Sequence, residues 1–453
     1  MNGFTTYYQI PTTIYPLLST HYPLLSTKYH LLTTMFPTTD NNALAATSFP
    51  KEKIKVLLLE NIHRSAIELF EKAGYTNIES LSGALPEDQL IEKLEDVRIL
   101  GIRSKTQVSA EVITKAEKLL AIGCFCIGTN QVNLTKATQA GIAVFNSPYS
   151  NTRSVAELVI AEIIMLIRRI PEKDKACHNG IWLKTTKGGS YEMRGKTLGI
   201  VGYGHIGSQV SVLAEAMGMK VFYYDIEPKL PMGNALPCET LEELLQIADV
   251  VTLHVPATPL TKNMMNKQTI AQMKPGSLLL NLSRGNVVDI DSLQDALLQK
   301  HIGGAAIDVF PAEPESVGDA FETPLRGINN VILTPHIGGS TQEAQSNIGI
   351  DVAHKLIGYI DKGATVGSHT IPELNLAPVH GTRRILHIHQ NVPGVLSAIN
   401  AVVSASNANI VGQYLKTNEL IGYVVLDIEN LHSDKILTDL RKIEHTIKTR
   451  ILY

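Results

Sequence analysis

Three glycines spaced G-x-G-x-x-G constrain the fold of this chain more than any other feature. Gly202, Gly204 and Gly207 follow the apolar run Thr197–Val201 and precede a helical pattern. In such a unit the first glycine permits a tight turn, the second lets backbone approach a pyrophosphate, and the third lets the helix pack on the strand. The helix N-terminus then offers N–H donors to the phosphates. The motif predicts a parallel α/β sheet that holds a dinucleotide.

An acidic residue ends the next apolar run. Asp225 stands directly behind Val221–Tyr224. A carboxylate there can accept hydrogen bonds from both ribose hydroxyls and would repel a 2′-phosphate. We therefore expect NAD rather than NADP as the cofactor. The alternative, a glycine turn without a ligand, is disfavoured because strand, helix and acid all stand in place.

The bulk composition excludes several kinds of protein. The 453 residues are too many for one core, so two or three domains are expected. A net charge of −3 without a basic block argues against nucleic acid or an anionic membrane as partner. No apolar run is long enough to span a membrane. The four cysteines have neither disulfide-framework density nor a metal-binding spacing, which favours a reducing cytoplasm and no bound metal.

The first 45 or so residues differ from the rest. A seven-residue repeat runs from Tyr15 to Thr34, and no acidic residue precedes Asp40. A signal peptide would need a basic start and a continuous apolar core, and neither is present. We interpret residues 1–50 as a disordered or non-native extension, with Met35 as an alternative start.

Strand and helix patterns alternate from Ile54 onward, which predicts two doubly wound, Rossmann-like α/β lobes with parallel sheets. A helix at Gln342–Lys362 returns the chain to the first lobe. We therefore expect a substrate-binding lobe in residues 51–149 and 336–364, with an NAD-binding lobe, residues 150–335, inserted in it. The expected strands are Ile54–Glu60, Ile99–Ile102, Leu120–Cys124, Ala143–Phe145, Lys220–Tyr224, Val250–Leu253, Ser277–Asn281, Gly304–Asp308 and Val331–Leu333, and a long helix is expected after Asn151–Ser154 to about Arg169.

The C-terminal part has a different pattern. Residues 365–383 are rich in Pro, Gly, His and Thr and are interpreted as a linker. Residues 384–453 follow the order βαββαβ of a small ferredoxin-like domain. Its elements are expected at Arg384–His389, Pro393–Ser406, Ile410–Thr417, Gly422–Ile428, Leu431–His445 and Ile447–Leu452.

Three polar residues come just after predicted strands of the second lobe, where open α/β sheets place their ligands. They are Arg284, Glu313 and His336. A histidine with a pKa near neutrality can accept a hydroxyl proton, and a carboxylate bonded to it would fix its orientation. An arginine would bind a substrate carboxylate and polarise the adjacent carbonyl oxygen. The set predicts hydride transfer between an alcohol carbon and nicotinamide.

With these residues the chain resembles the D-isomer-specific 2-hydroxyacid dehydrogenase family, and within it the members that end in an ACT regulatory domain. The similarity covers about residues 52–453. The resemblance implies oxidation of 3-phosphoglycerate to 3-phosphooxypyruvate with NAD, the first step of serine synthesis, in a homotetramer. It rests on the motifs Gly199–Gly207 with Asp225, Asn281–Gly285, Gly303–Pro314, Thr334–Thr341, Ile122–Asn130 and Asn151–Glu157.

The resemblance also implies roles for individual residues. Arg284 would bind substrate, Glu313 would orient His336, and His336 would accept the proton in oxidation. NAD contacts are implied for Gly202, Gly204, His205, Ile206, Gly207, Asp225, Leu282, Ser283, Arg284, Asp308, His336, Gly338 and Gly339.

The substrate phosphate needs cationic partners from the other lobe. By resemblance, Arg103, Ser104 and Lys105 form the turn that contacts it, and Asn151 also contacts substrate. Lys105 replaces an arginine common in the family, so the charge is kept but not the bidentate fork. A solvated basic turn without this role is the alternative.

The segment His389–Gly394 resembles the effector-binding signature of ACT domains. By resemblance, His389 and Asn391 of one subunit and Asn409 of its partner would hold L-serine, which would inhibit the enzyme. The alternative is a domain that only dimerises the chain. Trp182 resembles a subunit-contact residue of the family, but an ordinary core tryptophan fits the sequence equally well.

Other functions fit parts of the pattern. A different D-2-hydroxyacid dehydrogenase could act on lactate, glycerate or hydroxyglutarate, although the ACT-like domain and the basic turn argue against the first two. Reduction of 2-oxoglutarate as a side activity stays open, because a second carboxylate could occupy the phosphate position. A catalytically silent, NAD-sensing binding protein could use the same scaffold, but the presence of Arg284, Glu313 and His336 disfavours it.

Overall fold

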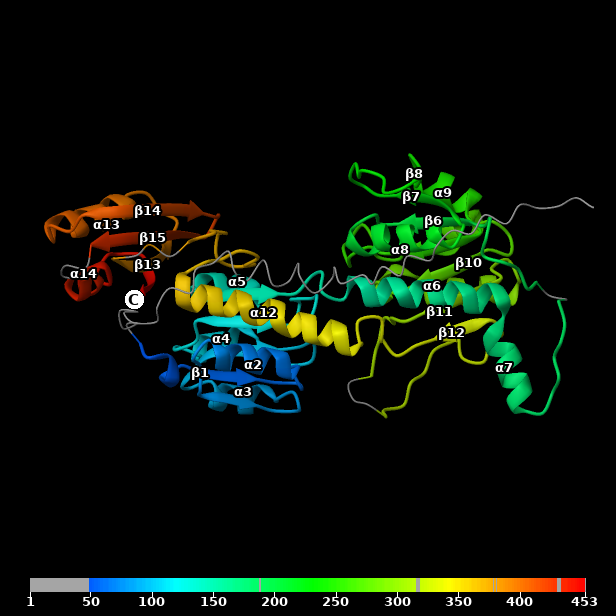
Figure 1. Cartoon of the computed structure of the whole chain (residues 1–453), viewed down its shortest axis with the longest axis horizontal. Helices are drawn as coiled ribbons and strands as arrows, with labels where there is room; N and C mark the ends of the chain where they lie inside the picture. Colours follow the sequence, from blue (N-terminus) through cyan, green and yellow to red (C-terminus); the bar gives the residue numbers. More distant parts are fainter. Residues whose placement is uncertain are drawn as a thin grey trace, which may run out of the picture. The chain divides into compact units, whose positions relative to one another are not determined.

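The structure is a computed structural model that describes residues 49–186, 189–314, 318–377, 379, 381–429 and 433–452. The seven-residue repeat lies outside the described residues. Within them the chain forms two parallel sheets and one antiparallel sheet (Figure 1). The predicted fold class, two Rossmann-like lobes followed by a small βαββαβ domain, is therefore confirmed.

The first sheet is parallel, with five strands in the order β2-β1-β3-β4-β5. Its elements are β1 (Lys55–Leu58), α2 (Arg64–Lys72), β2 (Ile78–Ser80), α3 (Glu87–Lys93), β3 (Val97–Ile102), α4 (Ala110–Lys115), β4 (Ala121–Cys124), α5 (Leu134–Gln139), β5 (Ala143–Asn146) and α12 (Gln342–Lys362), preceded by the 3-10 turn η1 (Lys51–Lys53). Every side chain of β4 and β5 is buried, because helices cover both faces of the sheet. One core includes Phe70 and Val352 from α2 and α12, and the other includes Leu90 and Val112 from α3 and α4.

The second sheet is parallel, with seven strands in the order β12-β11-β10-β9-β6-β7-β8. Its elements are α6 (Thr152–Arg168), α7 (Ile170–His178), β6 (Thr197–Val201), α8 (His205–Ala216), β7 (Lys220–Tyr224), β8 (Leu236–Pro237), α9 (Leu241–Ile247), β9 (Val250–Leu253), α10 (Lys267–Gln272), β10 (Leu278–Asn281), η2 (Gly285–Val287), α11 (Ile290–Leu298), β11 (Gly304–Ile307) and β12 (Val331–Leu333). The strand order reverses at β6, between β7 and β9. The glycine turn follows β6, so it lies at this switch point, where doubly wound sheets bind ligands.

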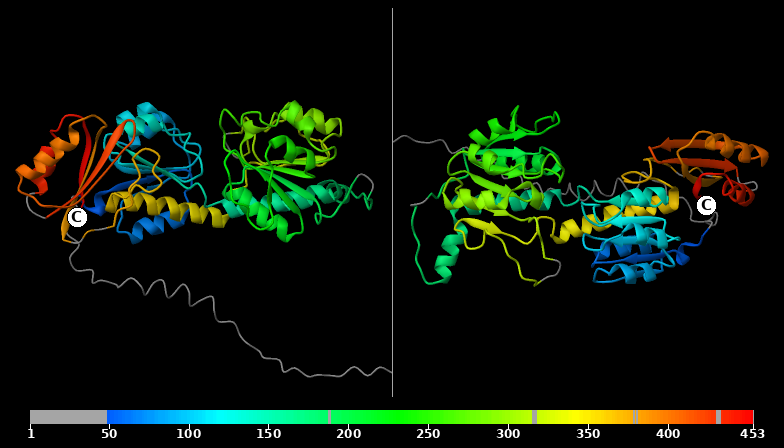
Figure 2. Two further views of the ribbon diagram at one scale, coloured as in Figure 1. Left: turned by 90° about the horizontal axis from the view of Figure 1, so that it is seen from above. Right: turned by 180° about the vertical axis from the view of Figure 1, so that it is seen from behind.

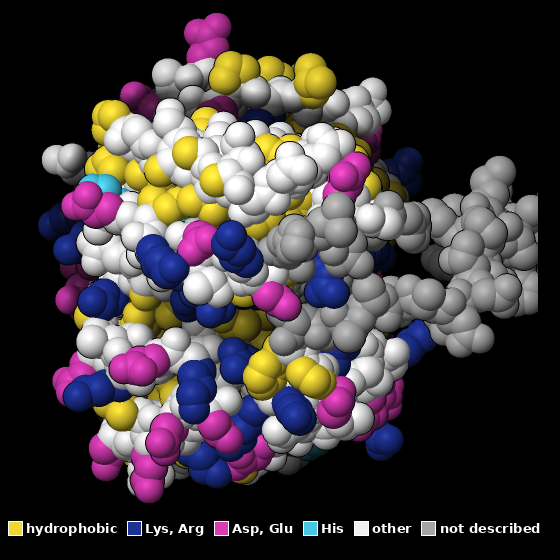
Figure 3. Space-filling model, turned by 90° about the vertical axis from the view of Figure 1, so that its left-hand side faces the viewer, with side chains coloured by type: hydrophobic (Ala, Val, Ile, Leu, Met, Phe, Trp, Pro, Cys, Tyr) yellow, Lys and Arg dark blue, Asp and Glu magenta, His cyan; other side chains and the backbone are white. Residues whose placement is uncertain are grey.

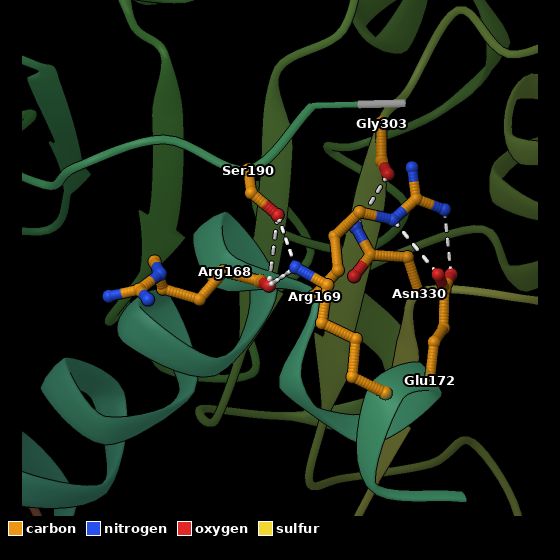
Figure 4. Close-up of polar contacts among 7 residues, drawn as sticks. Arg168, Arg169, Glu172, Ser190, Gly303 and Asn330 are labelled. Atoms are coloured by element: carbon orange, nitrogen blue, oxygen red, sulfur yellow. Dashed lines mark hydrogen bonds and ion pairs between the residues drawn. The ribbon is translucent and has the colours of Figure 1, made fainter. Parts of the chain in front are cut away.

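The long helix α6 ends where the sequence predicts. Arg169 has a left-handed backbone conformation (φ 54°) and lies between α6 and α7. Its guanidinium pairs with Glu172 at 2.7 Å, and the carbonyl of Arg168 accepts hydrogen bonds from Lys173 Nζ (3.2 Å) and Ser190 Oγ (3.3 Å) (Figure 4). These contacts fix the change of direction between the two helices.

The segment after α7 carries exposed apolar side chains. Trp182 is 83% exposed, and its neighbour Ile181 is 58% exposed. The alternative that Trp182 is a core tryptophan is therefore wrong for the single chain. Exposed aromatic and aliphatic groups side by side are typical of a surface that meets another protein.

The third sheet is antiparallel, in the order β14-β15-β13-β16. Its elements are β13 (Thr382–Gln390), α13 (Val395–Ala405), β14 (Ile410–Thr417), β15 (Ile421–Glu429), α14 (Ser433–Leu440) and β16 (Thr446–Leu452). The last helix, expected to reach His445, ends at Leu440. The hydroxyl of Thr446 donates to the carbonyl of Leu440 (3.2 Å), and His445 has a left-handed backbone conformation (φ 68°), so the chain turns before β16.

The segment expected to be a linker is packed on the first lobe. The hydroxyl of Thr370 accepts a hydrogen bond from Val144 N (3.0 Å) and donates one to Ile142 O (2.7 Å). The backbone of Ser368 forms an isolated antiparallel β-bridge with Phe145 of β5. A Pro- and Gly-rich segment lacks periodicity, but its polar side chains can replace missing strand partners. Residues 365–377 therefore extend the first lobe.

The third sheet shares a hydrophobic core with the first lobe. Leu386 and Tyr423, from β13 and β15, belong to the same buried cluster as Leu356 and Tyr359 of α12. The Tyr423 hydroxyl also donates to Gly363 O at 2.7 Å, just past the end of α12. Both further views show α12 extending along the first lobe toward the third sheet (Figure 2).

A buried ion pair strengthens this contact. Arg384 and Asp427 lie opposite each other on β13 and β15, and both side chains are fully buried. The guanidinium donates to the carboxylate at 2.7 and 2.8 Å, to Lys362 O at 2.9 Å and to Ala377 O at 2.7 Å. The pair therefore ties the third sheet to the end of α12 and to the segment that precedes the sheet.

Two further properties concern the whole described chain. None of its helices is long and apolar enough to cross a membrane. All four cysteines are free thiols, and Cys124 and Cys238 are buried. The three sheets are therefore held together without covalent cross-links.

Candidate active site

The glycine turn has the geometry that the spacing predicts. Gly202 has φ 91°, and a Cβ there would lie 2.4 Å from the carbonyl oxygen of His254. A Cβ at Gly207 would lie 2.2 Å from Gly202 O, so α8 can pack on the turn only without a side chain. Gly204 faces open space. Backbone at the N-terminus of α8 is therefore accessible to a phosphate, and the residues present fit a dinucleotide.

Asp225 is held beside this turn. Its carboxylate accepts a hydrogen bond from Tyr203 N (2.8 Å), which belongs to the turn, and one from Glu227 N (3.0 Å). The side chain is half-buried at the end of β7. His205, the first residue of α8, packs against Tyr149 with the ring centroids 3.8 Å apart and the ring planes tilted by 37°. Asp225 and the glycine turn are thus adjacent, as binding of the ribose and pyrophosphate of one nucleotide would require.

His336 and Glu313 form a hydrogen-bonded pair. Nδ1 of His336 lies 2.8 Å from Oε2 of Glu313, whose other oxygen accepts from Phe310 N at 3.1 Å. This hydrogen bond raises the pKa of His336 above its ordinary value, against the effect of burial. Burial opposes the ionisation of Glu313, but the bonds from His336 and Phe310 outweigh it and lower the pKa of Glu313. A charged carboxylate therefore faces Nδ1 and leaves Nε2 for proton transfer.

Arg284 lies close enough to this pair to affect its titration. Burial lowers the pKa of Arg284, while Cys126 and Glu313 raise it, and the arginine in turn lowers the pKa of His336. Its Nη1 donates to Ser283 O at 2.7 Å. The structure thus brings the three predicted catalytic residues into one cluster.

Gly285 allows the backbone beside Arg284 to come close to the backbone beside Glu313. A Cβ on Gly285 would lie 2.0 Å from the carbonyl oxygen of Phe310. Backbone following Arg284 therefore touches backbone that precedes Glu313. The reason for a glycine at this position is a long-range contact that the sequence does not reveal.

Asp308 holds the loop that carries His336. Its carboxylate accepts hydrogen bonds from Thr334 Oγ1 (2.7 Å), Ile337 N (2.8 Å) and Gly338 N (2.9 Å), and its carbonyl accepts from His336 N (2.8 Å). The resemblance implies that Asp308 contacts NAD. In the structure its carboxylate organises the loop, and a contact with NAD stays a prediction.

The basic turn at Arg103–Lys105 is held by an acid, Glu60, that the sequence analysis did not single out. Both carboxylate oxygens of buried Glu60 accept backbone N–H groups, from Arg103 (3.1 Å), Lys105 (3.0 Å) and Thr106 (2.9 Å). The side chains of Ser104 and Lys105 are exposed. The only available signal was an acid directly after the apolar strand that opens the first lobe.

Cys126 interacts electrostatically with both Arg103 and Arg284. Gln131 Nε2 donates to Arg103 O (2.6 Å) and to Cys126 Sγ (3.3 Å). Arg103 lowers the pKa of the Cys126 thiol, although burial raises it more, and Cys126 also acts on Arg284. The basic turn of the first lobe and Arg284 of the second lobe are therefore both close to Cys126.

Asn151, which precedes α6, has a side-chain oxygen without a hydrogen-bond donor among the described residues. This Oδ1 atom is buried, and the amide nitrogen of Asn151 would lie 2.5 Å from a Cβ at Gly339. Buried polar atoms are normally paired, so this one is available to a ligand.

The three residues implied in serine binding are not together in one chain. His389 is buried, with Nδ1 2.8 Å from Gln390 O and Nε2 without a partner among the described residues. Asn391 follows the same strand and donates to Asn418 O at 2.8 Å. Asn409 precedes β14 and donates to Glu429 at 3.1 Å, at the opposite end of the sheet.

The family comparisons agree with this architecture. Residues 160–338 match the NAD-binding domain of D-isomer specific 2-hydroxyacid dehydrogenases, and residues 385–448 match an AHAS small subunit-like ACT domain. A solved D-lactate dehydrogenase from Aquifex aeolicus, complexed with NAD and lactic acid, is similar with a TM-score of 0.60 and 25% identity over 70% of this chain and 100% of that one.

Curated relatives resemble the chain over nearly its whole length. D-3-phosphoglycerate dehydrogenase of Escherichia coli (strain K12) is 55% identical over 412 residues, covering 90% of this chain and 100% of that protein. D-3-phosphoglycerate dehydrogenase of Dictyostelium discoideum is 51% identical over 407 residues, covering 90% and 99%. The chain therefore belongs to the D-isomer-specific 2-hydroxyacid dehydrogenase family, and within it to the D-3-phosphoglycerate dehydrogenases with a C-terminal ACT domain.

Proposed function

We propose that this enzyme oxidises 3-phosphoglycerate to 3-phosphooxypyruvate with NAD. The observation that carries the proposal is the 2.8 Å contact between His336 and Glu313 beside Arg284. When bound, NAD would supply the acceptor for the hydride that leaves C2 of the substrate. Neutral His336 takes the hydroxyl proton at Nε2, and the resulting positive charge is stabilised by Glu313.

The remaining substrate groups find cationic partners. Arg284 binds the carboxylate and, as the C2–O bond becomes a carbonyl, polarises its oxygen. The phosphate binds at Arg103, Ser104 and Lys105, whose backbone Glu60 holds in a fixed turn. Asn151 supplies a further contact through its unpaired Oδ1. The NAD contacts predicted from the glycine motif, Asp225 and the His336 loop remain part of this proposal.

The test is NADH formation with 3-phosphoglycerate, run also in reverse with 3-phosphooxypyruvate and NADH. D-Glycerate, which lacks the phosphate, is the matched control substrate. Lys105→Gln is expected to raise the KM for 3-phosphoglycerate and leave turnover of glycerate unchanged, because glycerate has no phosphate for Lys105 to contact. Tight NAD binding without turnover of any hydroxyacid would overturn the enzymatic assignment in favour of a sensing protein.

We further infer that L-serine inhibits the enzyme at the ACT domain. β14 is an edge strand with exposed apolar side chains, including Val411 and Tyr414. Antiparallel pairing of two copies along β14 would bring His389 and Asn391 of one copy near Asn409 of the other. Serine titration of the wild type should lower the rate, and Asn391→Ala should weaken the inhibition while preserving kcat. Turnover unaffected by millimolar serine would contradict this regulatory part alone.

Two finer features belong to the same proposal. We infer a homotetramer, supported by the exposed apolar segment at Trp182 and by the edge strand β14, which would form two different interfaces. Light scattering coupled to size-exclusion chromatography measures the mass. We also infer a side activity that reduces 2-oxoglutarate, since the basic turn at Arg103 could hold a second carboxylate. NADH consumption with 2-oxoglutarate, lowered in Lys105→Gln, would support it.

A further inference from the structure

A cavity of about 490 Å³ lies where the ACT domain meets the edge of the first lobe. Among the described residues, seven Lys or Arg side chains and three Asp or Glu side chains line it. Apolar side chains, including Leu120 and Leu437, form the rest of its wall. On the face drawn in Figure 3, Lys and Arg side chains gather across the middle of the molecule around a hollow with hydrophobic groups at its floor. The cavity therefore has the charge of an anion site.

Three of these cations have no carboxylate partner among the residues that the structure describes. Arg98 lies on β3, and Lys448 and Arg450 lie on β16. Within the described chain none of them pairs with a carboxylate, whereas Lys51, on the same wall, pairs with Asp361 at 2.5 Å.

The contacts that these cations do make are with neutral groups. Lys448 Nζ donates to Leu119 O at 2.8 Å, and Arg450 Nη2 donates to Ile360 O at 2.9 Å. The guanidinium of Arg98 lies 4.0 Å from the ring centroid of Phe49. Nη1 of Arg450 is buried without a hydrogen-bond partner among the described residues.

The three cations repel one another. Burial, followed by the charges of Arg450 and Arg98, lowers the pKa of Lys448 to about 8. Burial and then Arg450 lower the pKa of Arg98. Crowded cations with an unpaired buried donor are costly unless an anion joins them. The unpaired donor and the crowded positive charges thus both require an anion as the partner.

We propose that this cavity binds the phosphate group of a small molecule between Arg98 of the first lobe and Lys448 and Arg450 of the ACT domain. Guanidinium groups bind phosphate oxygens through paired N–H donors, and the cavity leaves room for an organic part beside its apolar wall. The site is separate from the proposed substrate site, because Arg98 lies near the start of β3 whereas Arg103 follows its end. The inference does not depend on the identity of the substrate.

Sulfate binding to the full chain, measured by calorimetry, tests the site with a probe that does not titrate near neutral pH. Arg98→Gln should weaken one class of sulfate sites about tenfold, as expected for loss of one charge-assisted contact. Lys105→Gln should spare that class and affect only sulfate in the active site. Lys267→Gln, an exposed lysine on α10, should change neither. Equal sulfate affinity in Arg98→Gln and Lys267→Gln would overturn the proposal.

The pH dependence gives a second readout that does not depend on folding. Above pH 8 the wild type should lose sulfate affinity, by about tenfold in total, because Lys448 gives up its proton and one charge-assisted contact is lost. Lys448→Arg should keep the affinity up to pH 9.5. The other charged groups around the cavity are Lys51, Arg98, Glu117, Lys118, Asp361, Arg383, Asp434, Arg441 and Arg450. An identical pH profile in both proteins would count against the site.

Inorganic phosphate and glycerol 3-phosphate, used as probes, distinguish the two kinds of natural ligand that could supply the phosphate group: free phosphate and a phosphomonoester. If the natural ligand is a phosphomonoester, glycerol 3-phosphate should bind more tightly than phosphate in the wild type, and both should weaken in Arg98→Gln. If free phosphate is the ligand, the order should be reversed with the same response to Arg98→Gln. If Arg98→Gln leaves the affinity for both probes unchanged, neither probe binds in this cavity, and the proposal is wrong.

Discussion

His336 is held in a left-handed backbone conformation (φ 54°), which a residue with a Cβ adopts at an energetic cost. Asp308 stabilises this conformation by accepting the N–H groups of His336, Ile337 and Gly338. His336 is thereby held at two points, through its backbone N–H and through Nδ1 of its ring. A strained residue so firmly held is typical of a position that must present one atom accurately.

The pH profile of oxidation should depend on this arrangement. His336 must be neutral to accept a proton, so kcat/KM for 3-phosphoglycerate should rise with pH through the raised pKa of His336. In Glu313→Gln the charged partner is lost, so the pKa of His336 falls and the acidic limb of the profile moves to lower pH. His336→Ala should lower kcat by about 10²–10⁴-fold with NAD affinity nearly unchanged. An unshifted acidic limb in Glu313→Gln, measured by steady-state kinetics, would contradict the pairing.

Gly285→Ala should reduce activity without unfolding the protein. Its Cβ would lie 2.0 Å from Phe310 O, so the backbone beside Arg284 must move away from the segment that carries Glu313. We expect a fall in kcat/KM of about 10²-fold, as a misplacement near 1 Å produces. Gly358→Ala is the control, because nothing lies within 4 Å of its Cβ and the helix should gain stability. Equal activity of the two variants would refute the role given to Gly285.

The residues that sequence reasoning identified differ in kind from those it missed. Arg284, Glu313 and His336 stand out because they are ionisable residues that come just after predicted strands in the sequence. Glu60 does not stand out, because its partners are backbone N–H groups about 45 residues away, and such bonds leave no local pattern. The role of Asp308 in ordering the His336 loop was hidden for the same reason.

At the scale of elements, α12 was predicted with its observed bounds because both ends carry strong signals. Thr341 caps its first turn by accepting from Ala344 N, and Gly363 ends it with φ 73°. α14 was predicted too long, since nothing in the pattern up to His445 marks the end that Thr446 imposes at Leu440. The packing of residues 365–377 was missed because it depends on hydroxyl groups rather than on periodicity.

Removing one partner of the ion pair on β13 and β15 should destabilise the third sheet. Asp427→Asn leaves the fully buried Arg384 without its counter-charge, and such a loss typically costs about 3–5 kcal/mol. Urea unfolding followed by circular dichroism measures it. Asp439→Asn, which breaks an exposed pair with Lys442, should change the midpoint little. A midpoint for Asp427→Asn equal to that of Asp439→Asn would exclude an anchoring role.

At the scale of the whole molecule, the ACT domain is part of the structure of the first lobe. Leu356, Tyr359 and Ile360 of α12 are buried in a cluster completed by β13 and β15. Removing residues 364–453 should expose them, which costs roughly 5 kcal/mol at 1.5–3 kcal/mol per large apolar side chain. The truncated chain is expected to aggregate and to unfold at lower urea concentration, as light scattering and denaturation would detect. A monodisperse truncated chain with an unchanged midpoint would contradict the shared core.

α12 joins the two ends of the enzyme mechanically. It starts six residues after His336, at Gln342. Its other end contacts the ACT domain, because the carbonyls of Lys362 and Gly363 accept hydrogen bonds from Arg384 and Tyr423. Its 21 residues form a rod of about 31 Å, at 1.5 Å per residue. A lever of that length, pivoting at Gly363 through about 3°, moves its far tip by roughly 1.6 Å. That displacement is more than half of the 2.8 Å separation between His336 and Glu313, so a small rotation at one end of α12 is enough to disturb this contact at the other.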